Sequence, residues 1–168
     1  MEFSKKELAA MMKMGMYASA SDGHVDESEK KFISLHLGVF ALKNAKELND
    51  ELYNEVYQKS LTISFDNACD IVREMPNSKK RLVCAFVAMV ILADGNILPS
   101  ELEFWNLLSI ECGLPRMSIE EACDIYKDFC SKNYKKISSP ASNSGCCLVV
   151  AVPLILVMLI TISVSHFV

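Results

Sequence analysis

The stretch Ser78–Trp105, with the sequence SKKRLVCAFVAMVILADGNILPSELEFW, decides the fold that we expect for the chain. The twelve residues from Leu82 to Ala93 include no charged side chain. Because a helix that crosses a bilayer needs roughly 20 apolar residues, this run predicts a helix buried on all sides in a protein core. The run ends at Asp94-Gly95, and Pro99 suits the first position of a second, amphipathic helix. The apolar face of that second helix comprises Leu102, Trp105, Leu108 and Cys112.

Helical signals continue on both sides of this stretch. Ser4-x-x-Glu7 and Ser118-x-x-Glu121 have the pattern of a capping box, in which the two side chains bind the first free N–H groups of a helix. Apolar residues follow each box at helical spacing, and no segment shows strand-like alternation of useful length. The sequence therefore predicts an all-α domain over residues 1–136, a compact bundle of about seven helices.

The helical pattern contains a repeat in two divergent copies. The turn at Ala20–Val25 is matched, position by position, by Leu92–Ile97. We call the distance in sequence between these two matched segments the first offset. Ala68–Ile71 is matched by Ala122–Ile125, which gives a second, shorter offset. The two offsets differ by about the length of one helix, which we interpret as an insertion in the first copy. We expect the two copies to pack about a pseudo-two-fold axis as a compact domain, because a solenoid needs at least three repeats.

The overall composition excludes several function classes. The chain of 168 residues has a formal net charge of −4, whereas a nucleic-acid-binding surface is basic, so we expect no nucleic-acid partner. The seven cysteines are an odd number without the spacing of a zinc site, which fits a reduced cytosolic compartment. With three histidines and no recognisable pair of nucleophile and base, we expect that the protein is not an enzyme.

The composition changes after residue 136. Residues 137–145, ISSPASNSG, are uncharged and rich in Ser, Pro and Asn, which is typical of a linker. Residues 146–168 contain no Asp, Glu, Lys or Arg, and as a helix most of this segment would span ~28 Å, close to the thickness of a bilayer core. We expect one C-terminal transmembrane helix, and the alternative is a C-terminal helix buried in the core.

The charges around this tail predict its orientation. Four lysines precede the tail, whereas the only ionisable side chain near its far end is His166. The four are Lys127, Lys132, Lys135 and Lys136. By the positive-inside rule, the sequence predicts a single-pass membrane protein whose helical domain lies in the cytoplasm. The expected partners are therefore the lipid bilayer and a protein that the sequence does not identify.

Two acidic turns carry the candidate metal ligands, Asp22 with Glu29 and Asp94 with Glu101, each pair seven residues apart. The pattern copies the second half of an EF-hand calcium loop, but the first half lacks side-chain oxygens. If the two copies face each other, the four carboxylates could form one site for a divalent cation, Ca²⁺ or Mg²⁺ rather than Zn²⁺. Alternatively, the same residues only end one helix and cap the next.

These motifs resemble the TerB-like tellurite-resistance family. The resemblance is carried by the repeated Asp-Gly-x-[Val/Ile]-x-x-x-Glu signature, the apolar helix that leads into Leu92–Gly95, and the Gly113-Leu114 break before a capped helix. It covers roughly residues 1–132, and Ser21 stands where the family has Ala. The resemblance implies a helical bundle of two repeats with metal-binding acidic residues, linked to metal-stress and envelope-stress responses. Related domains occur beside membrane anchors and in membrane-attached co-chaperones.

Two function classes follow from these patterns. The first is a membrane-tethered module that binds or senses a divalent cation in metal or envelope stress. The second is a non-catalytic, co-chaperone-like adaptor that recruits a protein partner to the membrane, with the acidic turns serving only as helix caps. Other polar or reactive residues on apolar faces are interpreted as core residues. They are His36, Cys69, Cys84, Cys112, Cys123 and Cys130.

Overall fold

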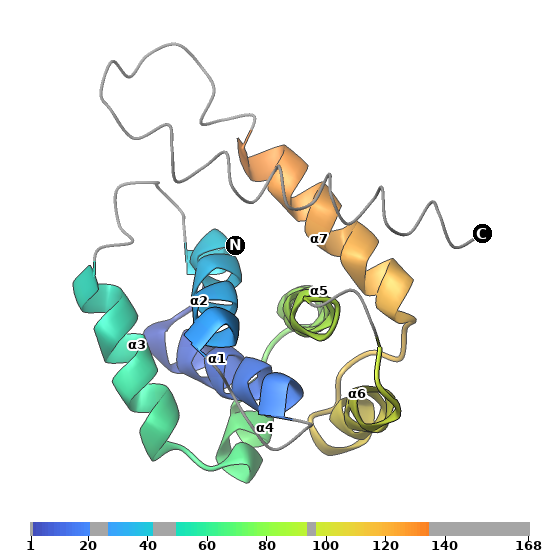
Figure 1. Cartoon of the computed structure of the whole chain (residues 1–168), viewed down its shortest axis with the longest axis horizontal. Coiled ribbons are helices and arrows are strands. Elements are labelled where there is room, and N and C mark those ends of the chain that lie inside the picture. Colours follow the sequence, from blue (N-terminus) through green and yellow to red (C-terminus); the bar gives the residue numbers. More distant parts are fainter. Residues whose placement is uncertain (1, 21–26, 42–49, 94–96, 135–168) are drawn as a thin grey trace. The chain divides into compact units, whose positions relative to one another are not determined.

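The computed structural model describes residues 2–20, 27–41, 50–93 and 97–134, and all regular structure in these ranges is helical (Figure 1). The helices are α1 (Lys5–Ser19), α2 (Glu27–Ala41), α3 (Asp50–Thr62), α4 (Phe65–Arg73), α5 (Asn77–Ile91), α6 (Pro99–Glu111) and α7 (Ile119–Tyr134). The prediction of an all-α fold with about seven helices is confirmed for these ranges. The chain divides into two compact units, residues 1–126 and 127–168.

Helix α1 is central to the first unit. It packs against α2, α3, α4 and α5 and also contacts α6 (Figure 1). Three of its methionines, Met11, Met12 and Met14, are no more than 1% exposed. The helix begins with the predicted capping box, because the Glu7 N–H donates to the Ser4 hydroxyl at 3.2 Å and the Ser4 N–H donates to the Glu7 carboxylate at 2.6 Å.

Helix α5 is the second central helix and corresponds to the buried run that the sequence predicts. All ten residues from Leu82 to Ile91 are buried. The ring of Phe86 faces Gly15 of α1, where an added Cβ would lie 3.0 Å from two ring carbons. Since only glycine leaves this space free, the small residue at position 15 allows α1 and α5 to approach closely.

An ion pair joins the first turns of α1 and α5. The Lys79 ammonium group donates to the Glu7 carboxylate at 2.7 Å, and the two side chains are only 15% and 17% exposed. The same ammonium group lies over the Phe3 ring, 5.1 Å from its centre. Burial alone would raise the pKa of Glu7, but the hydrogen bonds from Lys79 and Ser4 outweigh it and hold the pKa below its ordinary value. The pair therefore stabilises the contact between the two central helices at neutral pH.

The ends of the other helices follow the expected cap chemistry. The Asn67 N–H donates to the Ser64 hydroxyl at the start of α4. Ser118 and Glu121 form a reciprocal capping box at the start of α7. After α6 the chain turns at Gly113, whose φ of 60° is a left-handed conformation that favours glycine. These local sequence signals therefore mark where the helices begin and end.

Several sequence predictions lie outside the described residues. They include most of the two repeated turns, which contain residues 21–26 and 94–96, the linker at 137–145 and the C-terminal segment 146–168. Over the ranges given above, no helix combines the length and the apolar character that a membrane crossing requires.

Candidate functional site

The structure places the side chain of one of the four candidate metal ligands. Glu101 is the third residue of α6, is 8% exposed, and accepts the Leu98 N–H at 2.8 Å. This geometry is that of a helix cap. Asp22 and Asp94 lie outside the described residues, as does the side chain of Glu29 in α2. Among the side chains that the structure describes, no group of three or more His, Cys, Asp or Glu could hold a metal ion, so the cation site stays a prediction.

Helix α6 is apolar around most of its circumference, although it buries only a narrow face. Its buried residues are Glu101 and Leu108. Leu102 and Ile110 are 45% and 69% exposed, and Leu98, directly before the helix, is 42% exposed. Because these three residues are separated by steps of four and eight positions, they lie along one side of the helix. We call Leu98, Leu102 and Ile110 the apolar strip of α6.

A groove with a volume of about 330 Å³ adjoins the apolar strip. Residues of α5, α6 and the loop after α6 line it: Cys84, Trp105, Asn106, Leu108, Ser109, Ile110, Leu114, Pro115, Arg116 and Met117. Most of these side chains are apolar, and Trp105 is the single tryptophan of the chain. Since Ile110 belongs to both the strip and the groove, the two form one continuous surface.

Contacts within its walls hold the groove in shape. The Trp105 indole N–H donates to the Met117 carbonyl oxygen at 3.1 Å. The Cys84 thiol approaches the Pro115 carbonyl oxygen at 3.9 Å. Burial raises the pKa of the Cys84 thiol to about 12, so it is neutral at physiological pH and is a poor nucleophile. The groove is therefore better suited to binding than to chemistry.

Three cationic side chains surround the end of the groove near the loop after α6. Arg116 is exposed and lines the groove. Arg81 precedes Cys84 by three residues on α5, and its charge lowers the pKa of that thiol against the larger effect of burial. The Lys80 ammonium group lies 3.8 Å from the position that a Cβ on Gly113 would take. Within the described ranges none of the three cations forms an ion pair, so this end of the groove is positive.

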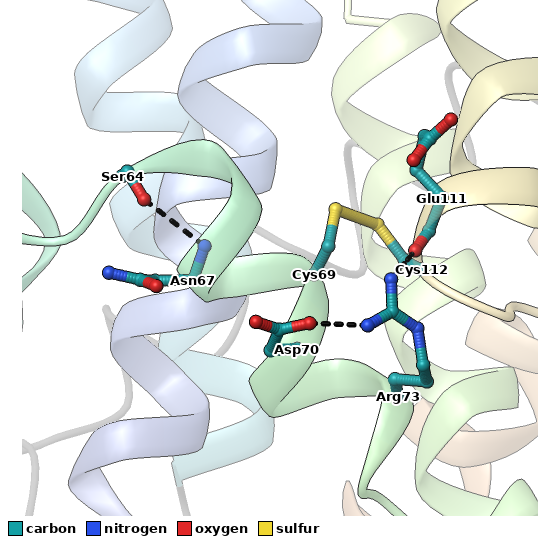
Figure 2. A network of polar contacts seen from close by, with 7 residues as sticks. All are labelled: Ser64, Asn67, Cys69, Asp70, Arg73, Glu111 and Cys112. Carbon is teal, nitrogen blue, oxygen red and sulfur yellow. Dashed lines mark hydrogen bonds and ion pairs between the residues drawn. A yellow bond between two sulfur atoms is a disulfide. The ribbon is translucent and has the colours of Figure 1, made fainter.

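A disulfide joins α4 to the end of α6 (Figure 2). It links Cys69 to Cys112, and both residues are buried. Beside it, the Arg73 guanidinium donates to the Asp70 carboxylate and to the Glu111 carbonyl oxygen (Figure 2). Cys69 and Cys112 are therefore core residues, as the sequence predicts, but the disulfide between them was not predicted. The sequence separation of 43 carries no spacing signal that could have predicted the pair.

His36 is a buried core histidine, as the sequence predicts. Its side chain is fully buried, and Nδ1 forms a 2.6 Å hydrogen bond with the hydroxyl of Tyr126, which is also fully buried. The Phe32 ring lies 4.1 Å from the imidazole, centre to centre. Burial lowers the pKa of His36 to about 4, so the ring is neutral at physiological pH and has a structural role.

Comparisons with known proteins inform the fold. No protein-family model and no curated protein matches the chain. Among solved structures, the chain is similar to the crystal structure of a protein of unknown function from Porphyromonas gingivalis W83. The two are 27% identical, with a TM-score of 0.64, over 76% of this chain and 92% of that chain. The likeness covers most of both chains and supports the helical architecture.

The groove was not predicted from the sequence, although one signal for it was present. The apolar spacing placed Leu102 on one face with Trp105 and Leu108, but Leu102 is 45% exposed. An amphipathic helix usually has one apolar stripe, whereas the apolar residues of α6 also occupy positions 107 and 110. This excess indicates a second apolar surface. No sequence signal indicated that Arg116 would lie beside it.

Proposed function

We propose that the helical domain is a non-catalytic adaptor of TerB-like type, which binds a protein partner and is held at a membrane by residues 146–168. The continuous apolar surface of the α6 strip and the groove carries this proposal. Exposed apolar surfaces of this kind mark interaction sites on soluble domains. Trp105 and Arg116 in the groove are of the residue types that contribute most to binding energies at protein interfaces.

The two-repeat organisation is part of this proposal, and the helix bounds support it. The first offset, which relates Ala20 to Leu92, also relates both ends of α1 to those of α5 and the start of α2 to that of α6. The second offset, which relates Ala68 to Ala122, also relates the start of α4 to that of α7. Glu7 and Lys79 are equivalent under the first offset and form an ion pair, as expected of residues close to a pseudo-two-fold axis.

Site-specific photo-crosslinking tests the adaptor function. A photoreactive amino acid replaces Leu102 in the whole chain, and cells that produce the variant are irradiated before membranes are isolated. We expect a crosslink to a discrete partner protein in the membrane fraction. The matched control carries the same group at Leu61 of α3, which is 50% exposed but lies outside the strip and groove. The same crosslinks from both positions, or none from Leu102, would contradict the proposal.

A second candidate function is the binding of a divalent cation by the acidic turns. The position of Glu101 favours it, because this residue is buried at the start of α6, directly after the second acidic turn, and carboxylate oxygens are ligands that Ca²⁺ and Mg²⁺ prefer. A cation that binds only the folded protein should stabilise it by about 2.7 kcal/mol at a hundredfold excess over its dissociation constant.

Thermal unfolding of the whole chain with Ca²⁺, Mg²⁺, Mn²⁺ or Zn²⁺ tests this second function. Without metal, the double variant Asp22→Asn, Asp94→Asn should be as stable as the wild-type chain, because Asn retains the turn and cap chemistry. With metal, it should lack the stabilisation that the wild-type chain gains, because two carboxylate ligands are missing. If none of the four cations changes the unfolding of the wild-type protein, cation binding is excluded and the adaptor function stands alone.

A further inference from the structure

We infer that the groove and the apolar strip bind an amphipathic segment of the partner protein that carries apolar side chains along one face and acidic side chains at one end. This inference rests on the adaptor function proposed above and specifies the chemistry of its partner. Two properties of the surface lead to it, namely its length and the charge around the groove, and Trp105 in the groove provides the test.

The length of the surface favours a stretch of polypeptide over a small molecule. The groove volume of about 330 Å³ is near the lower limit for small-molecule pockets, which is roughly 300 Å³. However, the apolar surface continues from Ile110 along α6 to Leu98, a distance of ~18 Å at the rise of an α-helix. A partner helix of about twelve residues has the same length and could place successive apolar side chains along the strip.

The charge around the groove decides which kind of segment fits. Arg116, Arg81 and Lys80 are close to its end at the loop after α6. The exposed acidic residues of α6 are Glu103 and Glu111, and neither lines the groove, although Glu103 lies two turns before Ile110 and so beside the strip. Acidic side chains of the partner would therefore meet unpaired cations at the groove, whereas basic side chains would be repelled.

A protein segment also suits this surface better than a lipid surface does. The cations are at one end of the groove, but the strip extends away from them for the length of the helix. A bilayer surface is broad and its headgroups would contact the cations without filling the groove. In contrast, a single helix or extended segment can place apolar side chains beside Trp105 while its acidic end reaches Arg116.

Trp105 provides a direct test, because it is the only tryptophan in the chain and lines the groove. The whole chain is reconstituted in phosphatidylcholine vesicles, and its tryptophan emission is recorded during titration with a synthetic peptide. The peptide is an amphipathic helix about 18 residues long, built from Leu, Ala and Glu without Trp or Tyr, with its glutamates toward one end. A matched basic peptide has Lys in place of every Glu. We expect a saturable change in emission with the acidic peptide only.

Two variants of the chain connect the signal to the proposed contacts. Arg116→Glu should weaken binding of the acidic peptide by about tenfold or more, since it replaces an attraction between opposite charges with a repulsion between like charges. Ile110→Ser should weaken it by about fivefold or more through the loss of apolar contact. The control Lys59→Glu makes the same charge change as Arg116→Glu on an exposed part of α3 and should leave the binding unchanged.

Each other outcome would overturn the inference. Equal binding of the acidic and basic peptides, no saturable response to the acidic peptide, or indifference to Arg116→Glu would show that the partner chemistry is wrong. A response to vesicles of anionic lipid without peptide would identify a lipid surface as the occupant. Dimerisation of the chain that Ile110→Ser abolishes would identify a second copy. In all of these cases a specific crosslink from Leu102 would still support the adaptor function, so the two proposals fail separately.

Discussion

Helices α5 and α6 are both rich in apolar residues, but they use them differently. In α5 every residue from Leu82 to Ile91 is buried, and Phe86 packs against α1. In α6 only Glu101 and Leu108 are buried, while Leu102 and Ile110 are exposed. Apolar content therefore does not by itself show whether a helix stabilises the fold or presents a binding surface. The exposure of each residue separates these two roles.

The counterpart of α6 in the proposed repeat sharpens the comparison. Helix α2 is equivalent to α6 under the first offset and packs against both α1 and α5. It buries Ile33, Leu37 and Phe40, each at most 4% exposed. At the position equivalent to Leu37, α6 has Ser109, which lines the groove. Under the proposed adaptor function, we interpret α6 as the copy whose outer surface is uncovered and binds the partner.

The largest expected effect comes from the buried helix. Phe86→Ala should lower the free energy of unfolding by about 3–5 kcal/mol, because it removes a fully buried ring and leaves a cavity between α1 and α5. Denaturant unfolding of the wild-type and variant chains measures the difference. A loss below about 1 kcal/mol would show that α5 is not central to the core.

The second effect concerns how α6 is attached. The Cys69–Cys112 disulfide joins cysteines with a sequence separation of 43, and loop-closure entropy predicts that reduction costs about 4 kcal/mol. Because α6 buries little surface of its own, amide hydrogen exchange should increase in α6 before it increases in α5. The double variant Cys69→Ser, Cys112→Ser is the control and should not respond to reductant. Unchanged stability of the wild-type chain on reduction would contradict this prediction.

The third effect is a pH dependence of the core. The pKa of His36 is lowered by burial to about 4, below the ordinary 6.5, so the folded protein disfavours the protonated ring. The neutral ring therefore contributes to the free energy of unfolding. This contribution is fully present above about pH 6.5, is lost as the pH decreases toward 4, and amounts to about 3 kcal/mol at most. Within the described residues Nε2 has no hydrogen-bond partner to stabilise the charge.

Unfolding measured at pH 7 and pH 4.5 checks this dependence. His36→Gln can retain a hydrogen bond to Tyr126 but cannot be protonated. The variant should therefore lose less stability than the wild-type chain between pH 7 and pH 4.5. The remaining loss is expected from carboxylates such as Glu7, whose pKa is held low in the folded state. If the variant and the wild-type chain lose the same stability, His36 does not carry the effect.

The sequence was sufficient for the features that depend on local chemistry. The capping boxes at Ser4 and Ser118 and the uncharged run in α5 each act within a few residues, so their patterns predicted helices and burial correctly. The groove could not be predicted, because the exposure of Leu102 depends on which side of α6 the other helices leave uncovered. The Cys69–Cys112 pair likewise depends on the approach of α4 to α6. The proposed cation site involves residues that the structure does not describe.

The central claim is that the apolar strip of α6 serves a partner and not the fold, and the stability of the double variant Leu102→Ser, Ile110→Ser tests it most directly. Both residues are largely exposed, so we expect each substitution to lower the free energy of unfolding of the whole chain by no more than about 1 kcal/mol. This would be the smallest effect of the series, in contrast to that of Phe86→Ala. A loss of more than about 2 kcal/mol would show that another part of the chain covers the strip, and would contradict the claim.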